Sequence, residues 1–226
     1  MPFKKIQAQL GNLESNEVIL NEEYGDNEEI LLEEVEEMRG TNSKVFKTNS
    51  GKYEYHYYDN IIHSYDEETG FTEIDSSFEE ISNEYSSNSL KYNIKVPKKI
   101  TENKKIKLSY ENTKIELTYN DISKQTGTII SNENNDISSL NHLIGTVRYE
   151  NIYDNVDLEL ITNSTTLKEN IILNNYVENF SFSYNISITN LTLVNENNYL
   201  NFYDEDNKLI YQINPYFMFD TNNNVS

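Results

Sequence analysis

The sequence predicts an all-β, mainly antiparallel fold: a β-sandwich-like domain preceded by a short acidic N-terminal helix or flexible leader. Apolar and polar residues alternate over many short runs, and turn-forming Asn, Asp, Ser and Gly residues separate these runs. No long amphipathic helical pattern lies between the runs, which argues against a parallel sheet built from strand–helix–strand units. The 18 Tyr and 9 Phe among 226 residues supply large side chains for a β core.

Residues 1–40 differ in composition from the rest of the chain and predict an acidic leader. Glutamate is dense over residues 22–37. Weak helical spacing occurs at four apolar positions, Ile30, Leu31, Val35 and Met38. Like charges four residues apart weaken an isolated helix, so both a short helix and a flexible leader are expected outcomes. The β-sandwich-like domain is predicted over residues 41–221, with a linker or tail over residues 222–226.

Strand patterns begin at Lys44. Residues 44–58 predict a strand, an Asn-Ser-Gly turn and a second strand. Residues 61–75 repeat this plan around a turn at residues 68–70. Residues 76–89 are rich in Ser, Asn and Glu and lack strand periodicity, so they predict a loop with a helical turn.

The middle and end of the chain continue the pattern of short strands. The clearest hairpin turns at residues 111–113, and a final hairpin turns at residues 204–207. A polar stretch over residues 131–141 predicts an exposed loop. Further strands are predicted within residues 90–97, 106–110, 115–119, 167–175, 179–194 and 199–213.

The stretch GTVRYENIYDNVDLELI, residues 145–161, is the most informative part of the sequence. It alternates as a strand, breaks at Tyr-Asp-Asn, and alternates again. We expect Tyr149 and Tyr153 to shape the two strands. Asp154, Asn155 and Asp157 are expected to fix the corner between them through turn chemistry and backbone hydrogen bonds. This architectural role is favoured over a binding role.

Charge and composition exclude several classes of function. The net charge is −20, and such an acidic surface repels phosphate backbones and anionic lipid headgroups, so nucleic-acid and peripheral membrane binding are not expected. No stretch approaches the roughly 18 apolar residues of a membrane span, so membrane insertion is not expected. The first 20 residues lack the apolar core of a signal peptide. With no cysteine, the chain has no disulfide and no thiolate nucleophile.

The sequence carries no signature of catalysis, and we expect neither an enzyme nor a bound cofactor. The three histidines lack a nucleophile motif around them; His63 lies near Asp66, without the sequence context of a catalytic triad. A glycan-cleaving enzyme would need two facing carboxylates at a characteristic separation.

Two groups of residues are candidates for ligand binding. The first is a set of tyrosines that could stack on a sugar ring: Tyr53, Tyr57 and Tyr58. The second is a set of oxygen ligands that would suit Ca²⁺: Asp204, Asp206 and Asn207. Tyrosines in strands more often form cross-strand pairs, and Asp and Asn are favoured in turns for backbone reasons. Both groups therefore have a structural interpretation that we favour.

Three motifs occur in the order found in one bacterial family. The first is Arg-x-x-Asn-Ser-Lys-x-Phe, which includes Asn42 and Phe46 and is followed by His63, Tyr65, Asp66, Ile74 and Asp75. The second is the corner motif of residues 149–159 with Lys-Glu-x-Ile-x-Leu at residues 168–173. The third is the closing hairpin with its Pro-Tyr exit. Over residues 36–221 the chain resembles the N-terminal β-rich region of bacterial DNRLRE-domain proteins and wall-associated Rhs (YD-repeat) proteins.

The resemblance implies a non-enzymatic structural or interaction module of a bacterial surface, secreted or toxin-delivery protein. It implies an extracellular or cell-surface location and brings no catalytic residues. The expected partner is a protein, bound through an exposed sheet edge or the acidic leader. A carbohydrate-binding module, with Ca²⁺ at a turn, is the alternative. The partner's identity, the oligomeric state and the compartment are left open.

Overall fold

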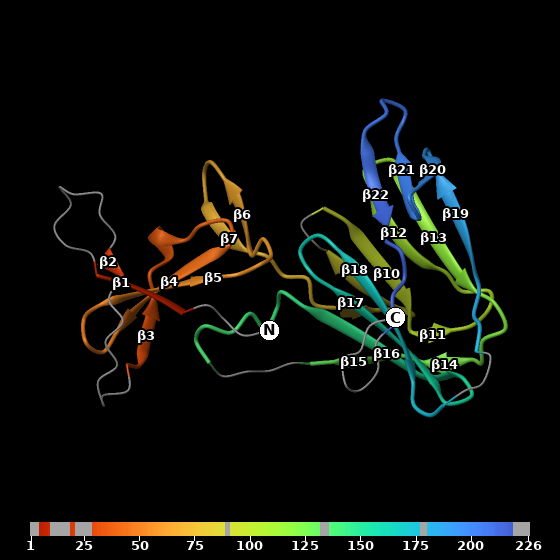
Figure 1. Ribbon diagram of the computed structural model, residues 1–226, viewed down its shortest axis with the longest axis horizontal. Helices are drawn as coiled ribbons and strands as arrows, with labels where there is room; N and C mark the ends of the chain where they lie inside the picture. The colour runs from red at the N-terminus through yellow and green to blue at the C-terminus, as the bar shows by residue number, and fades with distance from the viewer. Residues whose placement is uncertain are drawn as a thin grey trace.

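The protein is described here by a computed structural model, which covers residues 5–9, 19–20, 29–88, 91–131, 136–176 and 180–218. Its sheets are antiparallel, and among these residues the sole helical element is a 3₁₀ turn, η1 (Glu36–Met38). The predicted all-β fold class is confirmed. Figure 1 shows two lobes, a small lobe with β1–β7 and a large lobe with β8–β22. The predicted tail over residues 222–226 lies outside the described residues.

The small lobe contains a five-stranded sheet in the order β2-β1-β5-β4-β3 and the separate hairpin β6–β7. Val45 and Phe46 of β4 are fully buried, and as successive strand residues they lie on opposite faces of the sheet. The Asn-Ser-Gly turn predicted after β4 is present, and Gly51 adopts the positive φ of 81° that glycine allows. The strands are β1 (Lys5–Gln9), β2 (Ile19–Leu20), β3 (Leu31–Glu34), β4 (Ser43–Thr48), β5 (Tyr53–Tyr57), β6 (His63–Asp66) and β7 (Gly70–Glu73).

The expectation of a helix or flexible leader is wrong for residues 31–34. These residues form strand β3, which pairs with β4, and the amide of Val35 donates to Val45 O at 2.8 Å. Backbone pairing with β4 and the ion pairs of Glu34 stabilise the strand. A short helix with only weak apolar spacing would be less stable than this strand. Since β1, β2 and β3 all belong to the sheet of β4 and β5, the predicted boundary at residue 40 cuts through this sheet.

The large lobe has a six-stranded sheet, β19-β13-β12-β10-β9-β8, and a four-stranded sheet, β15-β16-β17-β18. The three-stranded sheet β20-β21-β22 and the pair β11–β14 complete it. Its strands are β8 (Glu79–Ile81), β9 (Glu84–Asn88), β10 (Asn93–Pro97), β11 (Lys99–Ile100), β12 (Ile106–Tyr110), β13 (Thr113–Tyr119), β14 (Gln125–Thr126), β15 (Thr128–Ile130), β16 (Gly145–Tyr153), β17 (Val156–Thr162), β18 (Leu167–Leu173), β19 (Tyr184–Thr189), β20 (Thr192–Glu196), β21 (Tyr199–Tyr203) and β22 (Leu209–Ile213).

The loop predicted over residues 76–89 is instead the hairpin β8–β9, which turns at Ser82 with φ 60°. Its buried strand is polar because its side chains find partners inside the protein. Ser87 is 1% exposed and donates its hydroxyl to Ser76 O at 2.7 Å. Buried serines whose hydroxyls are hydrogen-bonded occupy positions where a strand prediction expects apolar residues.

One continuous hydrophobic core joins the sheets of the large lobe. It takes Ile94 from β10, Ile115 from β13, Leu158 from β17 and Phe202 from β21. Tyr149 of β16 is fully buried among them, and its hydroxyl donates to Pro97 O at 2.6 Å. A buried tyrosine of this kind supplies apolar surface while its hydroxyl remains hydrogen-bonded.

The two lobes meet at a second, smaller cluster formed by Tyr58, Ile62, Ile74 and Leu143. Tyr58 belongs to the small lobe, and its hydroxyl donates to Ser138 O at 3.0 Å, in the loop before β16 of the large lobe. Backbone bonds such as Ser76 N to His142 O at 2.7 Å reinforce this lobe junction. The predicted domain of residues 41–221 is therefore divided between two lobes that share a limited contact.

Candidate functional site

The corner motif of residues 145–161 lies between β16 and β17. Asp157 is 3% exposed; its Oδ2 accepts from Arg148 Nη2 at 2.7 Å and its Oδ1 accepts from the amide of Asn151 at 2.7 Å. Asn155 turns the chain with φ 58°, and the Tyr153 hydroxyl donates to Asn120 O at 2.8 Å. Burial would raise the pKa of Asp157, but the hydrogen bonds from Arg148 and Asn151 outweigh it and lower this pKa.

Asp157→Asn is expected to lower the free energy of unfolding at pH 7 by about 1.5–3 kcal/mol, the range for a hydrogen bond to a charged group. Because the folded-state pKa of Asp157 is lowered, its stabilisation is present above the unfolded-state value and is lost as pH falls through the folded-state value. Urea unfolding at pH 7 and pH 3 measures this difference, which should shrink at pH 3. The exposed neighbour variant Asp154→Asn is the control; an equal loss in both variants would contradict the prediction.

The remaining motif residues of the small lobe have structural contacts. Asn42 donates its side-chain amide to Tyr58 O at 3.1 Å. Phe46 packs edge-on against His56, with ring centroids 4.9 Å apart. His63 is 1% exposed and bonds through Nδ1 to Gly40 O at 2.7 Å, whereas Asp66 accepts the amides of its own turn. His63 and Asp66 are therefore not joined as a catalytic pair.

The structure does not bring the three candidate tyrosines together on one surface. Tyr57 is 49% exposed, Tyr53 is half-buried, and Tyr58 is 7% exposed inside the lobe junction. Tyr58 follows the last residue of β5 and is drawn into the contact with the large lobe. The three side chains therefore do not form a shared sugar-stacking platform.

The candidate Ca²⁺ ligands Asp204, Asp206 and Asn207 form the hairpin turn between β21 and β22. Asp204 Oδ1 accepts the backbone amides of Asp206 at 3.0 Å and Lys208 at 2.8 Å, and Asn207 has φ 59°. These contacts are those of turn-forming residues. Within the described ranges, no group of three or more His, Asp or Glu side chains is arranged to hold a metal ion.

A hollow of about 430 Å³ lies beside the β8–β9 hairpin and is lined in part by Lys104, Lys105 and Lys107. Lys105 pairs with Glu116 at 2.8 Å, and Lys107 pairs with Glu84 at 2.7 Å. Two of its three lysines are thus engaged by carboxylates of the protein, and much of the positive charge in the hollow is neutralised.

A more distinctive surface follows the uncharged run of residues 179–195. Charged residues make up 25% of the chain, yet none occurs between Glu178 and Glu196. This run contains β19 and all of β20 except its last residue, Glu196, and each strand is the outermost of its sheet. β19 pairs with β13, and β20 pairs with β21, so the other side of each strand has no neighbouring strand among the described residues.

The side chains of β20 are open to solvent, and so are those of β19 except Tyr184 and Ile186, which pack against the main core. All five residues of β20 are exposed, including Leu193 at 45% and Val194 at 36%. Ile188 of β19 is 38% exposed. Natural β proteins usually protect long edge strands with charges, proline or a covering segment, because an open edge pairs readily with another chain. An uncharged, exposed edge in a protein of net charge −20 is therefore a candidate interaction surface.

An aromatic row leads into β19. Phe180, Phe182 and Tyr184 occupy alternate positions, with successive ring centroids 6.1 Å and 6.3 Å apart and interplanar angles of 28° and 25°. Tyr216 packs edge-on against Phe182 at 6.1 Å. We call β19, β20 and this aromatic row the docking edge. The strand pattern predicted these strands, but the uncharged run was the signal that could have identified them as a site.

Comparison with known proteins assigns no family: no family model, no curated protein and no solved structure matches this chain. In the described part of the chain, no helix is long and apolar enough to cross a membrane. The resemblance to the DNRLRE-domain and Rhs proteins stays a prediction from the sequence motifs.

Proposed function

We propose that this chain is a non-enzymatic interaction module of a bacterial surface, secreted or toxin-delivery (Rhs-like) protein, and that it binds a protein partner at the docking edge. The observation that carries the binding proposal is the pair of solvent-exposed edge strands β19 and β20, which belong to two sheets and contain Glu196 as their one charged residue. The bacterial family and the surface location rest on the sequence motifs alone.

Strand addition is the binding mode that fits this edge. A partner segment in extended conformation would pair its backbone with the outer side of β19 or β20, which supplies affinity without dependence on sequence. Alternate side chains of the partner would then lie beside apolar residues such as Ile188 and Leu193, which supplies specificity. Because the module carries a net charge of −20, a partner segment flanked by basic residues is favoured on encounter.

Selection of extended peptides from a displayed library tests this mode. We expect enriched peptides to alternate apolar and polar residues and to carry Lys or Arg at their ends. Leu193→Lys should raise the Kd of these peptides about tenfold or more, equivalent to about 1.4 kcal/mol, because it places charge at the edge and removes an apolar contact. Isothermal titration calorimetry measures the change.

Tyr65→Lys is the matched control, since Tyr65 is 65% exposed in the small lobe, away from the docking edge. Its Kd for the same peptides should equal that of the unchanged protein. Peptides that bind Leu193→Lys as tightly as the unchanged protein would show that the edge is not the binding surface.

A carbohydrate-binding module is the second candidate, favoured by the row of Phe180, Phe182 and Tyr184 rather than by the earlier candidates Tyr53, Tyr57 and Tyr58. Stacking on aromatic rings would carry affinity for a sugar. A glycan array distinguishes the two functions: binding of a glycan that is lost in Phe182→Ala and retained in Leu193→Lys would favour carbohydrate over peptide.

A further inference from the structure

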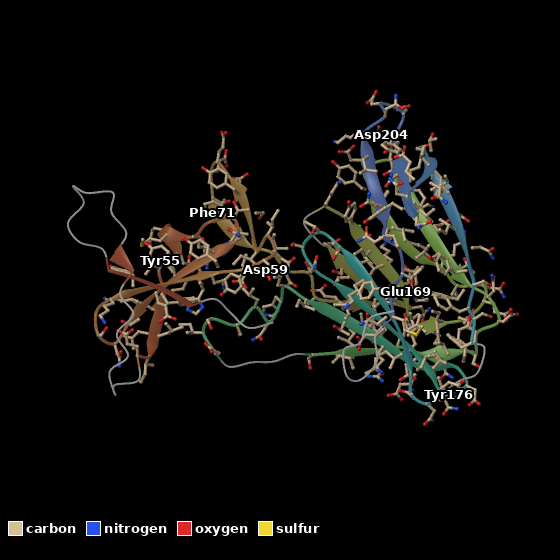
Figure 2. All side chains as sticks on the ribbon, viewed as in Figure 1. Tyr55, Asp59, Phe71, Glu169, Tyr176 and Asp204 are labelled. Atoms are coloured by element: carbon tan, nitrogen blue, oxygen red, sulfur yellow. The ribbon has the colours of Figure 1, made fainter. Side chains whose placement is uncertain are left out.

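A carboxylic acid lies on the core-facing side of β18. Glu169 alternates with Leu167 and Ile171, which both pack against the main core, and it lies opposite Leu160 of β17. Leu160 is 1% exposed. Figure 2 shows Glu169 within the large lobe. An acidic residue at this position interrupts an otherwise apolar row, and the strand pattern alone gives no reason for it.

Tyrosines surround this carboxyl group. Tyr119 of β13 is 1% exposed, and its ring lies 5.8 Å from that of Tyr184 of β19. The hydroxyls of Tyr184 and Tyr216 are hydrogen-bonded to each other. Glu169 Oε1 and the Tyr119 hydroxyl are both buried, and neither makes a hydrogen bond of normal geometry. The Tyr119 hydroxyl and the Glu169 carboxyl interact with each other, but Glu169 Oε1 and the Tyr119 hydroxyl keep unused hydrogen-bonding capacity.

The charge state of Glu169 reflects this setting. Burial raises the pKa of its carboxyl group, and the nearby Tyr119 hydroxyl offsets only part of that effect. The titratable groups that face it are four tyrosines: Tyr119, Tyr153, Tyr184 and Tyr216. The pKa of each tyrosine is raised, mainly by burial, so all four stay neutral near pH 7. The site therefore offers one potential negative charge and no compensating cation among the described residues.

We propose that Glu169 forms the base of a site for a primary ammonium group, carried by a lysine side chain of the segment that binds at the docking edge. This inference rests on the proposed function and names the chemistry that anchors the partner. An ammonium group has three donors and no acceptor, which matches a carboxylate and a neighbouring tyrosine hydroxyl that both have acceptor capacity left. Aromatic faces around a cation add cation–π attraction.

The position of the site supports a side chain from the docking edge as its occupant. Tyr184 is the first residue of β19, so the tyrosines around Glu169 lie where the docking edge begins. Tyr216 is 58% exposed and belongs to residues 214–218, which have no regular secondary structure. If the Tyr184 and Tyr216 hydroxyls separate, a narrow and flexible side chain can reach Glu169 between them. Lysine, with a compact charge at the end of a flexible chain, fits this path better than arginine does.

A small amine tests the site directly. We expect n-butylammonium, titrated into the whole protein with ¹³C-labelled glutamate carboxyls, to lower the apparent pKa of Glu169 and to shift the ring resonances of Tyr184 and Tyr216. The neutral isostere n-butanol should produce neither change. Glu169→Gln should weaken butylammonium binding about tenfold or more, as expected for loss of the paired charge, whereas Lys168→Gln on the outer face of β18 should not.

A Glu169 carboxyl that does not respond to butylammonium would overturn the proposal, as would equal binding by Glu169→Gln. A peptide selected at the docking edge separates this outcome from failure of the proposed function. If that peptide binds but replacement of its lysine by norleucine changes nothing, the ammonium site is wrong and the docking edge stands. If norleucine weakens binding to the unchanged protein about tenfold and leaves binding to Glu169→Gln unaffected, the lysine is anchored at Glu169.

Discussion

Glu34→Gln is expected to lower the free energy of unfolding by about 3–5 kcal/mol, the range measured when one partner of a buried ion pair is removed. Glu34 binds Arg39 through both carboxylate oxygens, at 2.6 Å from Nε and 3.1 Å from Nη2. Lys44 Nζ lies 3.6 Å from Glu34 and 2.7 Å from Glu73. The Arg39 and Lys44 side chains are only 12% and 4% exposed, so the substitution removes the carboxylate shared by two largely buried cations and leaves them only Glu36 and Glu73.

The pH dependence gives a second measure of the same ion network. Burial acts to raise the pKa of Glu34, but the Arg39 hydrogen bond and the charges of Lys44 and Arg39 lower it overall. Its contribution is therefore present at neutral pH and is lost as pH falls through the lowered folded-state pKa. The unchanged protein should lose stability on acidification more steeply than Glu34→Gln does.

Urea unfolding measures the change in stability. Hydrogen exchange of the β3 and β4 amides then shows whether the change is located in the small lobe. Glu33→Gln on the same strand is the control, since the Glu33 side chain is 68% exposed and its substitution should change stability by no more than about 0.5 kcal/mol. Similar stabilities for Glu34→Gln and Glu33→Gln would mean that the network contributes little.

Tyr149→Ala is expected to destabilise the large lobe by about 3–5 kcal/mol, as large-to-small changes of buried aromatic residues do. Tyr149 is fully buried, and its ring packs so closely on Gly127 that a Cβ there would lie 2.7 Å from the ring. Alanine would leave a cavity at this contact, which the surrounding sheets cannot fill completely. It would also leave Pro97 O without the hydrogen bond that it receives at 2.6 Å.

One further variant separates the ring of Tyr149 from its hydroxyl, and an exposed tyrosine serves as the control. Tyr149→Phe keeps the ring and should lose about 1–2 kcal/mol, the effect of one buried hydrogen bond. Tyr176→Ala should be nearly neutral because Tyr176 is 90% exposed. Thermal unfolding measures all three, and a Tyr149→Ala variant as stable as Tyr176→Ala would be inconsistent with a core role for Tyr149.

The strands that the sequence predicted best are those in which the alternation of apolar residues matches the alternation of buried side chains. In β13 the burial pattern alternates from Thr113 to Tyr119 as the apolar residues do, and the corner after β16 turns at Asn155 with a positive φ. The β8–β9 hairpin was missed because Ser86 and Ser87 are buried polar residues. Their partners, such as Ser76 O, are supplied by tertiary contacts that local patterns do not contain.

The candidate site was harder to predict because it depends on the order of strands in the sheets. Whether β19 is an edge or a central strand is decided by its pairing with β13, for example Glu116 opposite Ser187, across a long separation in sequence. Alternation identifies a strand but not its neighbours. The tyrosine candidates failed as a group for a related reason, since Tyr58 is buried by a loop from the other lobe.

The small size of the lobe junction has a mechanical consequence. Tension that pulls the small lobe away from the large one loads the cluster of Tyr58, Ile62, Ile74 and Leu143 and the Tyr58–Ser138 hydrogen bond. This contact buries far fewer side chains than the main core of the large lobe. We therefore expect the lobes to separate at low force, before either set of sheets unravels. The protein would thus extend by a short, reversible step that leaves the docking edge intact.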